Sequence, residues 1–452
     1  MSNHHDSFLD RLPGGWTFDR LKDVVALRNE KTSEASEDED YLELEDLESS
    51  TGRILSRRNT LEVESAVTLF KKGDVLFGKL RPYLEKYYEA EFDGKCTGEI
   101  LAFKPERMAS RFLSYCVGSR WFIERCNALA YGAKMPRVSW EKQLSQFYMP
   151  LPPHSEQQRI ASYLDASCAA IDAAMAAKRQ QLEILDDLVA SIVCQAVTQG
   201  LERDIEMKTS GLDWVQKVPA HWKVQQIKRM CSLVRGQFTH RPRNDPALYD
   251  GPYPFVQIGD ITAARKYILT HSQTLNELGL SVSKMFPKGT LVVSIAANIG
   301  DVAILDFDAC FPDSMVGMIP SHTINIDYLY YLMRAMKGIM LRSAVLSTQL
   351  NLNYVRIGTN FAPVPPKKEQ EAIAKYLDAK EHDVAAVKET LTNQITTLLL
   401  YRKSLIHECV TGQRRITEAD STLRPGSLLR QASGGQAVSA GSPQADVWRS
   451  GG

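Results

Sequence analysis

An internal duplication constrains the fold of this 452-residue chain more than any other feature of its sequence. The segment Leu12–Trp16, LPGGW, returns as Val218–Trp222, VPAHW. The segment Leu151–Gln157, LPPHSEQ, returns as Val364–Gln370, VPPKKEQ, and the pattern Ile-Ala-x-Tyr-Leu-Asp follows both copies. Chance does not produce so long a match in one order, so the chain is predicted to run as block, helix, block, helix.

Two long helices are predicted after the Pro-Pro pairs, at about residues 155–199 and 369–411, because neither stretch contains Gly or Pro. Gly200 and Gly412 are natural helix stops. Apolar residues recur at seven-residue spacing, which indicates a coiled-coil seam. The predicted helix-pairing residues are Leu164, Ile171, Leu185 and Ile192 in the first helix and Leu377, Val384, Leu391, Leu398 and Leu405 in the second.

This seam predicts that the two helices pair with each other. Roughly forty residues of helix span about 60 Å, which is too long for an apolar stripe to be buried within one compact domain. Lys178 interrupts the first seam, and Glu381, Lys388 and Arg402 occupy companion positions in the second. Packing of each helix on its own block, or on another chain, is the alternative.

The two blocks, residues 13–150 and 219–363, show the mixed pattern of α+β domains. Short apolar runs typical of strands occur at residues 74–77, 99–103, 291–295 and 302–305, and helical stretches at residues 110–126 and 327–347. The blocks match each other only weakly, for example at Phe112–Tyr115 and Tyr328–Tyr331. Such a pattern predicts a shared scaffold with different recognition surfaces.

Composition narrows the class of protein further. Lys+Arg and Asp+Glu both number 54, so the zero formal charge argues against a protein that simply coats DNA. The eight cysteines form no Cys-x-x-Cys pair, which argues against a zinc site or a disulfide framework. The sequence contains no run of eighteen apolar residues and no apolar stretch near Met1, so we expect a cytoplasmic protein without a membrane span.

No catalytic motif stands out. Residues 73–79, GDVLFGK, match the start of a phosphate-binding P-loop, but Leu80 replaces the hydroxyl residue that holds magnesium and Pro82 follows closely. No Gly-x-Gly-x-x-Gly occurs, and neither does the Asn/Asp-Pro-Pro-aromatic tetrapeptide of amino-methyltransferases. We therefore predict that the chain is not an enzyme and carries no cofactor or metal.

The ordered motifs resemble those of specificity subunits of type I restriction–modification systems. The resemblance rests on the Leu/Val-Pro-x-x-Trp openings, the Pro-Pro-x-x-Glu-Gln helix entries, and residues 401–406 (YRKSLI) with 410–412 (VTG) at the end of the second helix. Three further segments, residues 73–84, 257–261 and 348–352, are similar to segments of the recognition domains of that family. Together these motifs span about residues 12–416.

This resemblance implies a fold of two α+β target-recognition domains alternating with two long helices that pair as an antiparallel coiled coil. Each domain is expected to read one half of a split, asymmetric site in double-stranded DNA, with the helices setting the spacing. The implied partners are two adenine methyltransferase (M) subunits and restriction (R) subunits, which carry S-adenosylmethionine and ATP/Mg. The predicted segments are residues 1–152, 153–200, 201–364 and 365–416, followed by a disordered tail, 417–452, rich in Gly, Ser, Ala and Gln.

Basic, amide and tyrosine side chains at turns are the candidate DNA contacts, since they suit phosphates and base edges. In the first block they are Lys79, Arg81, Tyr83, Lys86 and Arg137, together with Tyr87 and Lys134. In the second block they are Arg235, Gln237, His240, Arg241, Arg243, Gln257, Asn298, Gln349 and Asn351, together with Arg265 and Lys266.

Two other functions stay open at this point. A single-chain methyltransferase or restriction enzyme would need an unrecognised active site, and binding of S-adenosylmethionine by the purified chain would favour it. A coiled-coil scaffold with protein-binding blocks is the second alternative, and DNA retention independent of sequence would favour that.

Overall fold

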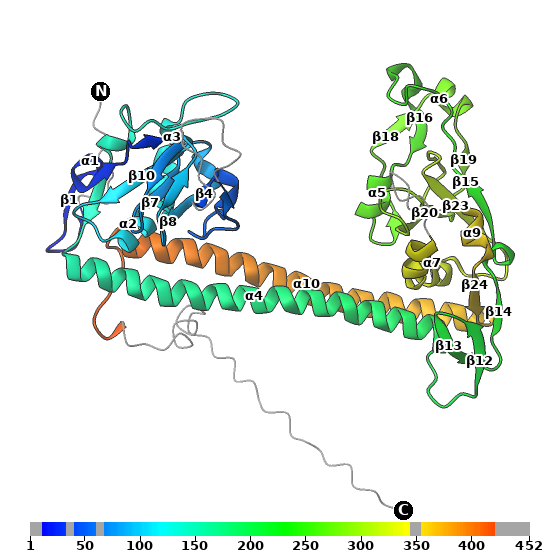
Figure 1. Cartoon of the computed structure of the whole chain (residues 1–452). Helices are drawn as coiled ribbons and strands as arrows, with labels where there is room; N and C mark the ends of the chain where they lie inside the picture. Colours follow the sequence, from blue (N-terminus) through cyan, green and yellow to red (C-terminus); the bar gives the residue numbers. More distant parts are fainter. Residues whose placement is uncertain (1–10, 33–39, 60–66, 344–353, 421–452) are drawn as a thin grey trace, which may run out of the picture. The chain divides into compact units, whose positions relative to one another are not determined.

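The computed structural model describes residues 11–32, 40–59, 67–343 and 354–420. The chain divides into two compact units, of which unit 1 comprises Met1–Arg179 with Thr392–Gly452 and unit 2 comprises Gln180–Leu391. Two long helices, α4 (His154–Gln199) and α10 (Lys367–Val410), contribute one part each to both units (Figure 1). Both helices begin and end within two residues of the stretches 155–199 and 369–411.

Unit 1 contains the first block, which is an α+β domain as predicted. Its central antiparallel sheet has the strand order β2 (Val25–Leu27), β10 (Ile100–Pro105), β7 (Val75–Gly78), β8 (Tyr87–Glu89). A second sheet has the order β3 (Lys31–Thr32), β6 (Val67–Phe70), β9 (Gly94–Cys96), β4 (Asp40–Leu42), β5 (Arg58–Asn59). The strands β1 (Thr17–Arg20) and β11 (Tyr148–Leu151) pair just before α4 begins, and the helices are α1 (Leu21–Val24), α2 (Ser110–Val117) and α3 (Arg120–Leu129).

Unit 2 contains the second block, which has its own central sheet in the order β15 (Cys231–Arg235), β23 (Met315–Pro320), β20 (Leu291–Ser294), β21 (Val302–Leu305), β17 (Tyr267–Ile268). A second sheet has the order β18 (Gln273–Leu275), β16 (Tyr249–Phe255), β22 (Ala309–Cys310), β19 (Met285–Phe286). The hairpin β12 (Met207–Leu212)–β13 (Val215–Pro219) follows α4, and β14 (Lys223–Gln226) pairs with β24 (Phe361–Val364). The helices are α5 (Ile258–Ala263), α6 (Glu277–Ser281), α7 (Ile326–Ala335), α8 (Lys337–Ser343) and α9 (Tyr354–Thr359).

The two blocks are built on one scaffold. The order β2–β10–β7–β8 in the first corresponds to β15–β23–β20–β21 in the second. In each block the first strand pairs with the last strand before a long helix, as β1–β11 and as β14–β24. The helix α2 follows β10 just as α7 follows β23, so the weak match of Phe112–Tyr115 with Tyr328–Tyr331 marks equivalent helices. The predicted shared scaffold is therefore present.

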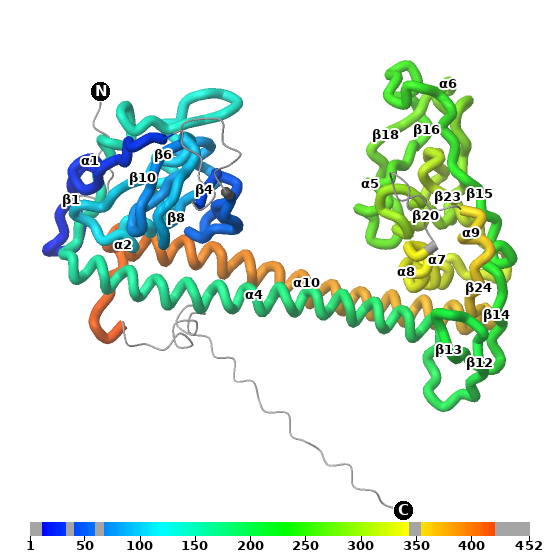
Figure 2. Tube along the Cα trace, viewed as in Figure 1, coloured from blue at the N-terminus to red at the C-terminus, as the bar shows by residue number. Residues whose placement is uncertain are grey.

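The helices α4 and α10 contact each other within each unit (Figure 2). In unit 1, Lys178 Nζ lies 2.6 Å from Gln394 Oε1, and the seam residues Leu164, Ile171 and Leu405 are buried. In unit 2, Lys388 Nζ lies 2.6 Å from Asp186 Oδ1, and Leu377 and Leu391 are buried. The remaining predicted pairing residues, Leu185, Ile192, Val384 and Leu398, are half-buried.

The charged companion positions, which weakened the predicted seam, all form ion pairs. Glu381 accepts from Arg334 of α7, so this position faces the second block. Lys388 pairs with Asp186 of α4. Arg402 is only 6% exposed, its Nε lies 3.2 Å from Asp172 Oδ1, and it donates to the carbonyl of Ser50 in the first block. These charges serve contacts with a block as well as with the other helix.

By length and composition alone, α4 is apolar enough to cross a membrane. Its most apolar eighteen-residue window is 44% buried in the structure. Ile160, Leu164 and Ile171 belong to the core of unit 1, and Val193 and Val197 belong to the core of unit 2. The apolar residues are thus used for packing along the helix.

Two predicted helices are broken in the structure. The stretch 110–126 forms α2 and α3, separated at Gly118, because the Ser119 hydroxyl accepts from the Phe122 N–H and starts a new helix. The stretch 327–347 forms α7 and α8, and its last residues, like the tail from residue 421, lie outside the described residues.

Candidate nucleic-acid interface

The loop between β7 and β8 presents the clearest candidate in the first block. Arg81 has a left-handed backbone (φ 50°), and its N–H donates to the Pro136 carbonyl at 2.7 Å. The side chain is half-buried and its Nε is buried, yet within the described residues it makes neither a hydrogen bond nor an ion pair. A buried N–H donor without a partner is costly, so the Arg81 side chain is a candidate to bind an acceptor from outside the chain.

Two other candidates in this block are engaged within the protein. Arg137 binds Glu99 through two nitrogens, at 3.0 and 3.2 Å. Lys86 donates to the carbonyl of Leu47. Both side chains therefore hold the loop in place. To contact DNA directly, Arg137 would have to leave the Glu99 carboxylate, and Lys86 would have to leave the Leu47 carbonyl.

Exposed side chains lie in the same loop as Arg81 and in the turn that pairs with this loop. Tyr83 is 53% exposed, and Lys79 lies at the edge of the same loop. The turn that contains Tyr131 and Met135 pairs with this loop through Arg137, and both side chains are exposed. Sequence reasoning missed Tyr131, because only the long-range pairing of residues 131 and 80 with residue 137 brings the turn to this place.

The equivalent loop of the second block, between β20 and β21, carries different chemistry. Ala297 has a left-handed backbone (φ 56°), as Arg81 has in the first block. The next residue, the predicted contact Asn298, donates to Thr262 Oγ1 at 3.1 Å. The same place on the scaffold thus presents a cation in one block and an amide in the other.

A basic loop is gathered around one aspartate in the second block. Arg243 pairs with the Asp313 carboxylate at 2.5 Å, and Arg241 lies 3.9 Å from it. Arg235 Nε donates to the Asp313 carbonyl at 2.7 Å. The structure therefore brings together three predicted arginines that are far apart from Asp313 in sequence.

Neighbouring candidates complete this loop. His240 lies 3.1 Å from Asp245, and the Gln237 backbone N–H donates to the Phe311 carbonyl at 3.1 Å while its side chain stays exposed. Gln349 and Asn351, also predicted as contacts, lie outside the described residues.

A groove of about 710 Å³ opens beside the basic loop. Its lining includes Arg243, Asp250, Gln257, Gln273 and Tyr249. The predicted Gln257 thus shares a surface with Arg243, whereas Asn298 lines neither this groove nor the basic loop. Gln273 was not singled out from the sequence, because its pairing with Gln257 joins the start of β18 to the start of α5.

Each block is fastened to a long helix by a repeated pair. Tyr115 donates to Asp165 of α4 at 2.7 Å, and Tyr331 donates to Asp378 of α10 at 2.7 Å. Burial raises the pKa of the Tyr331 hydroxyl, and its hydrogen bond to Asp378 raises it further. Both aspartates come from the repeated Tyr-Leu-Asp motif, which assigns that motif to attachment of the blocks.

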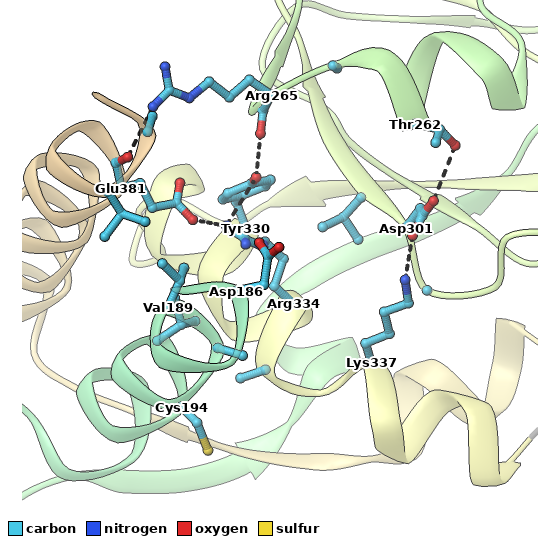
Figure 3. Close-up of a pocket in the computed structure, with 18 of the residues that line it drawn as sticks. Asp186, Val189, Cys194, Thr262, Arg265, Asp301, Tyr330, Arg334, Lys337 and Glu381 are labelled. Atoms are coloured by element: carbon cyan, nitrogen blue, oxygen red, sulfur yellow. Dashed lines mark hydrogen bonds and ion pairs between the residues drawn. The ribbon is translucent and has the colours of Figure 1, made fainter. Parts of the chain in front are cut away.

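A second cavity, of about 670 Å³, lies in unit 2 where the second block meets α4 and α10 (Figure 3). Lys337 pairs with Asp301 at 2.6 Å, and Arg265 donates to the Glu381 carbonyl at 3.1 Å. The charged side chains that line this cavity pair with one another, which indicates that they hold the second block on the long helices. Among the described residues, no group of three or more His, Cys, Asp or Glu side chains is arranged to hold a metal ion.

Two stretches of the chain, residues 13–184 and 219–397, match the family described as the type I restriction modification DNA specificity domain. The chain belongs to this family. A Methanocaldococcus jannaschii protein assigned as the MjaX type I restriction enzyme specificity subunit is 23% identical over 92% of this chain and 97% of its own length. The EcoDI specificity subunit of Escherichia coli is 26% identical over 42% of this chain and 43% of its own.

Solved structures agree on the fold. One chain, from work on complex assembly and conformational transition of the type I R-M system, superimposes with a TM-score of 0.71 at 18% identity, covering 89% of this chain and 99% of that one. The HsdS subunit of Thermoanaerobacter tengcongensis superimposes with a TM-score of 0.50 at 19% identity, covering 89% and 98%. Each block, together with much of the long helix that follows it, falls within one of the two stretches that match the DNA specificity domain.

Proposed function

We propose that the two specificity domains of this subunit read different halves of one split, asymmetric target in double-stranded DNA. The observation that carries the proposal is the pair of equivalent loops, which present Arg81 in one domain and Ala297 with Asn298 in the other. A guanidinium suits guanine edges or phosphates, whereas an amide suits adenine edges. A shared scaffold that presents a cation in one domain and an amide in the other reads two different half-sites.

Phosphate contacts position each domain and base contacts specify its half-site. In the first domain, Arg81, whose side chain has no partner among the described residues, is the central contact, flanked by Lys79 and Tyr83. In the second domain, the basic loop of Arg235, Arg241 and Arg243 lies at the phosphate backbone beside the groove. The near-zero net charge of the chain implies that its partners supply part of the electrostatic grip on DNA.

The long helices act as a spacer. We propose that α4 and α10 pair as an antiparallel coiled coil that fixes the distance between the half-sites. The supporting contacts are Lys178–Gln394 in unit 1 and Asp186–Lys388 in unit 2, since residue numbers rise along one helix as they fall along the other. The polar seam position Lys178 is matched by a polar partner, which suits a fixed register.

The same helices dock the catalytic partners. Apolar side chains stay exposed along them, at Ile184 and Leu188 on α4 and at Val387, Leu399 and Leu400 on α10. Ile184 and Leu188 are four residues apart and therefore share one face of α4, and contiguous exposed apolar surface is typical of protein interfaces. Two adenine methyltransferase subunits, which carry S-adenosylmethionine, would bind here, and ATP-dependent restriction subunits would join them. The chain itself would be non-catalytic and would act in the cytoplasm.

A map of methylated adenines across the genome of the source cells, with and without this gene, tests the function. Loss of one split, asymmetric motif on deletion is expected, and it gives both half-sites and their gap. An unchanged map from cells that express the methyltransferase partners would contradict the proposal.

Replacement of Lys79 and Arg81 by Ala tests the site in the first domain. We expect target affinity of the assembled complex to fall by at least about 30-fold, since two good base or phosphate contacts at about 1–3 kcal/mol each sum to about 2–6 kcal/mol. The matched control is Lys71→Ala with Lys72→Ala, which removes the same charge at the opposite end of β7. Equal affinity of both double variants at moderate salt would rule out the loop as a DNA contact.

A further inference from the structure

Two glutamine amides are held together at the edge of the groove in the second domain. Gln257 Nε2 donates to Gln273 Oε1 at 2.8 Å. The Asp260 carboxylate accepts from the Gln257 backbone N–H at 2.7 Å and from Ser272 Oγ at 3.2 Å. Asp260 thus ties together the two segments that carry the glutamines, at the start of α5 and the start of β18. Gln257 is half-buried and Gln273 is exposed, so Gln273 is the outer member of the pair.

This arrangement defines which hydrogen-bonding groups Gln273 still offers. A carboxamide has two N–H donors and two acceptor lone pairs on its oxygen. Gln257 occupies one lone pair, and no other side chain or backbone group of the described residues bonds to the Gln273 amide. One acceptor lone pair and both donors remain, side by side in one plane. The major-groove edge of adenine offers the complement, an acceptor at N7 and a donor at N6, whereas guanine offers two acceptors.

The charge of the groove argues against a phosphate as its occupant. Of the charged side chains in the lining, Arg243 is already paired with Asp313 at 2.5 Å, and Asp250 contributes a carboxylate. Within the lining the cation of Arg243 is offset by the carboxylate of Asp250, so the groove itself, unlike the basic loop beside it, offers a phosphate little net attraction. The buried rings of Phe238 and Phe255 form an apolar part of the lining. A neutral base edge fits these walls better than a phosphate.

We propose that Gln273 reads an adenine–thymine base pair in the half-site bound by the second domain, with Gln257 as its positioning residue. This inference rests on the proposed function and adds a residue and a base to it. Gln257 holds the amide plane of Gln273 so that its free donor and acceptor meet N7 and N6 together. Without Gln257 the Gln273 side chain rotates freely, and its bonds to the base cost more conformational entropy.

The test uses the full chain assembled with its methyltransferase partners, in the wild-type form and with Gln273→Ala and Gln273→Glu. Methylated adenines are mapped, and affinities are measured for duplexes substituted one base pair at a time. For Gln273→Ala we expect discrimination at one adenine–thymine position to fall roughly 5- to 100-fold, with all other positions unchanged. Glutamate keeps the acceptor and loses the donors, so Gln273→Glu should shift that position towards cytosine, whose N4 is a donor.

Gln257→Ala is expected to weaken discrimination at the same position and at no other. Adding Gln273→Ala to it should cause little further loss. The control is Gln216→Ala, which removes an exposed amide on β13, outside the second block. A specific motif that neither Gln273 variant alters, or a uniform loss of affinity for every duplex, overturns the inference while leaving the proposed function intact. Absence of any motif that depends on the wild-type chain overturns both.

Discussion

Replacement of Gln370 by Ala should destabilise unit 2 strongly, although the side chain is a short polar one at the start of α10. Gln370 is 1% exposed, and its Oε1 accepts from the Asn325 N–H at 2.8 Å, at the N-cap of α7. Its Nε2 donates to the carbonyls of Pro365 at 2.9 Å and Thr323 at 3.2 Å. One amide therefore satisfies three backbone groups between the second block and α10.

The expected magnitude follows from the groups left without a partner. A buried donor or acceptor that loses its partner costs about 1–3 kcal/mol. The Asn325 N–H has one hydrogen and bears this cost in full, while each carbonyl keeps a second lone pair that water can reach after truncation. We therefore expect Gln370→Ala to lower the free energy of unfolding by about 2–4 kcal/mol. The repeated residue Gln157 makes two such bonds, at 2.7 and 2.9 Å, so Gln157→Ala should cost about 1–3 kcal/mol.

Urea unfolding, followed by circular dichroism, measures the loss, and hydrogen exchange at Asn325 locates it. The two units need not unfold together, so exchange in each unit separates the effect of Gln370→Ala from that of Gln157→Ala. Gln158→Ala is the matched control because Gln158 is the exposed neighbour of Gln157 and should change stability by less than about 0.5 kcal/mol. If Gln370→Ala cost no more than this control, the repeated glutamine would not join block to helix.

Three further predictions concern the helices. A Cβ at Gly412 would lie 2.4 Å from Pro13 Cδ, so Gly412→Ala should lower the free energy of unfolding in urea by about 2–4 kcal/mol. At Gly200 the nearest contact of a Cβ would be 3.2 Å, so Gly200→Ala should cost about 1–2 kcal/mol. Equal losses would contradict the close packing at Gly412. Leu185→Pro should break α4 at a cost of about 3 kcal/mol and abolish co-purification of the methyltransferase, whose normal recovery would exclude this docking role. Burial lowers the pKa of His407 in the folded protein, so stability should fall as the pH drops below about 6.5, the pKa of histidine in the unfolded chain. His407→Gln should remove this pH dependence. A urea midpoint whose pH profile is the same in the variant and the wild type would refute the prediction.

The helices and the duplicated scaffold could be predicted because their signals are local or repeated. The seven-residue spacing and the stops at Gly200 and Gly412 placed both helix ends within two residues. The repeated Pro-Pro-x-x-Glu-Gln motif marked the entry of each helix, and its glutamine caps an equivalent helix in each block. A local pattern that occurs twice is more reliable than a single occurrence, because both copies predict the same structure independently.

The candidate site was less accessible to sequence reasoning. Arg137 and Lys86 are basic residues in turns, yet one is bound to Glu99 and the other to the Leu47 carbonyl. Nothing local distinguishes them from Arg81, whose guanidinium has no partner within the described residues. Gln273 escaped notice for the same reason, since its partner Gln257 comes from another segment. Long-range contacts decide which polar side chains lack a partner, and these contacts cannot be inferred from composition.

The division between repeated and divergent residues explains how one scaffold can serve two half-sites. The attachment pairs Tyr115–Asp165 and Tyr331–Asp378 are the same in both units, because each must hold a block on a helix. The loop residues Arg81 and Ala297 occupy equivalent places and share a left-handed backbone, but their side chains are unrelated. A change of side chain at that place leaves the attachment untouched, since none of the fastening hydrogen bonds passes through it. Recognition can therefore diverge between the two domains at little cost in stability, which accounts for a sequence match that is strong at the helix entries and weak in the loops.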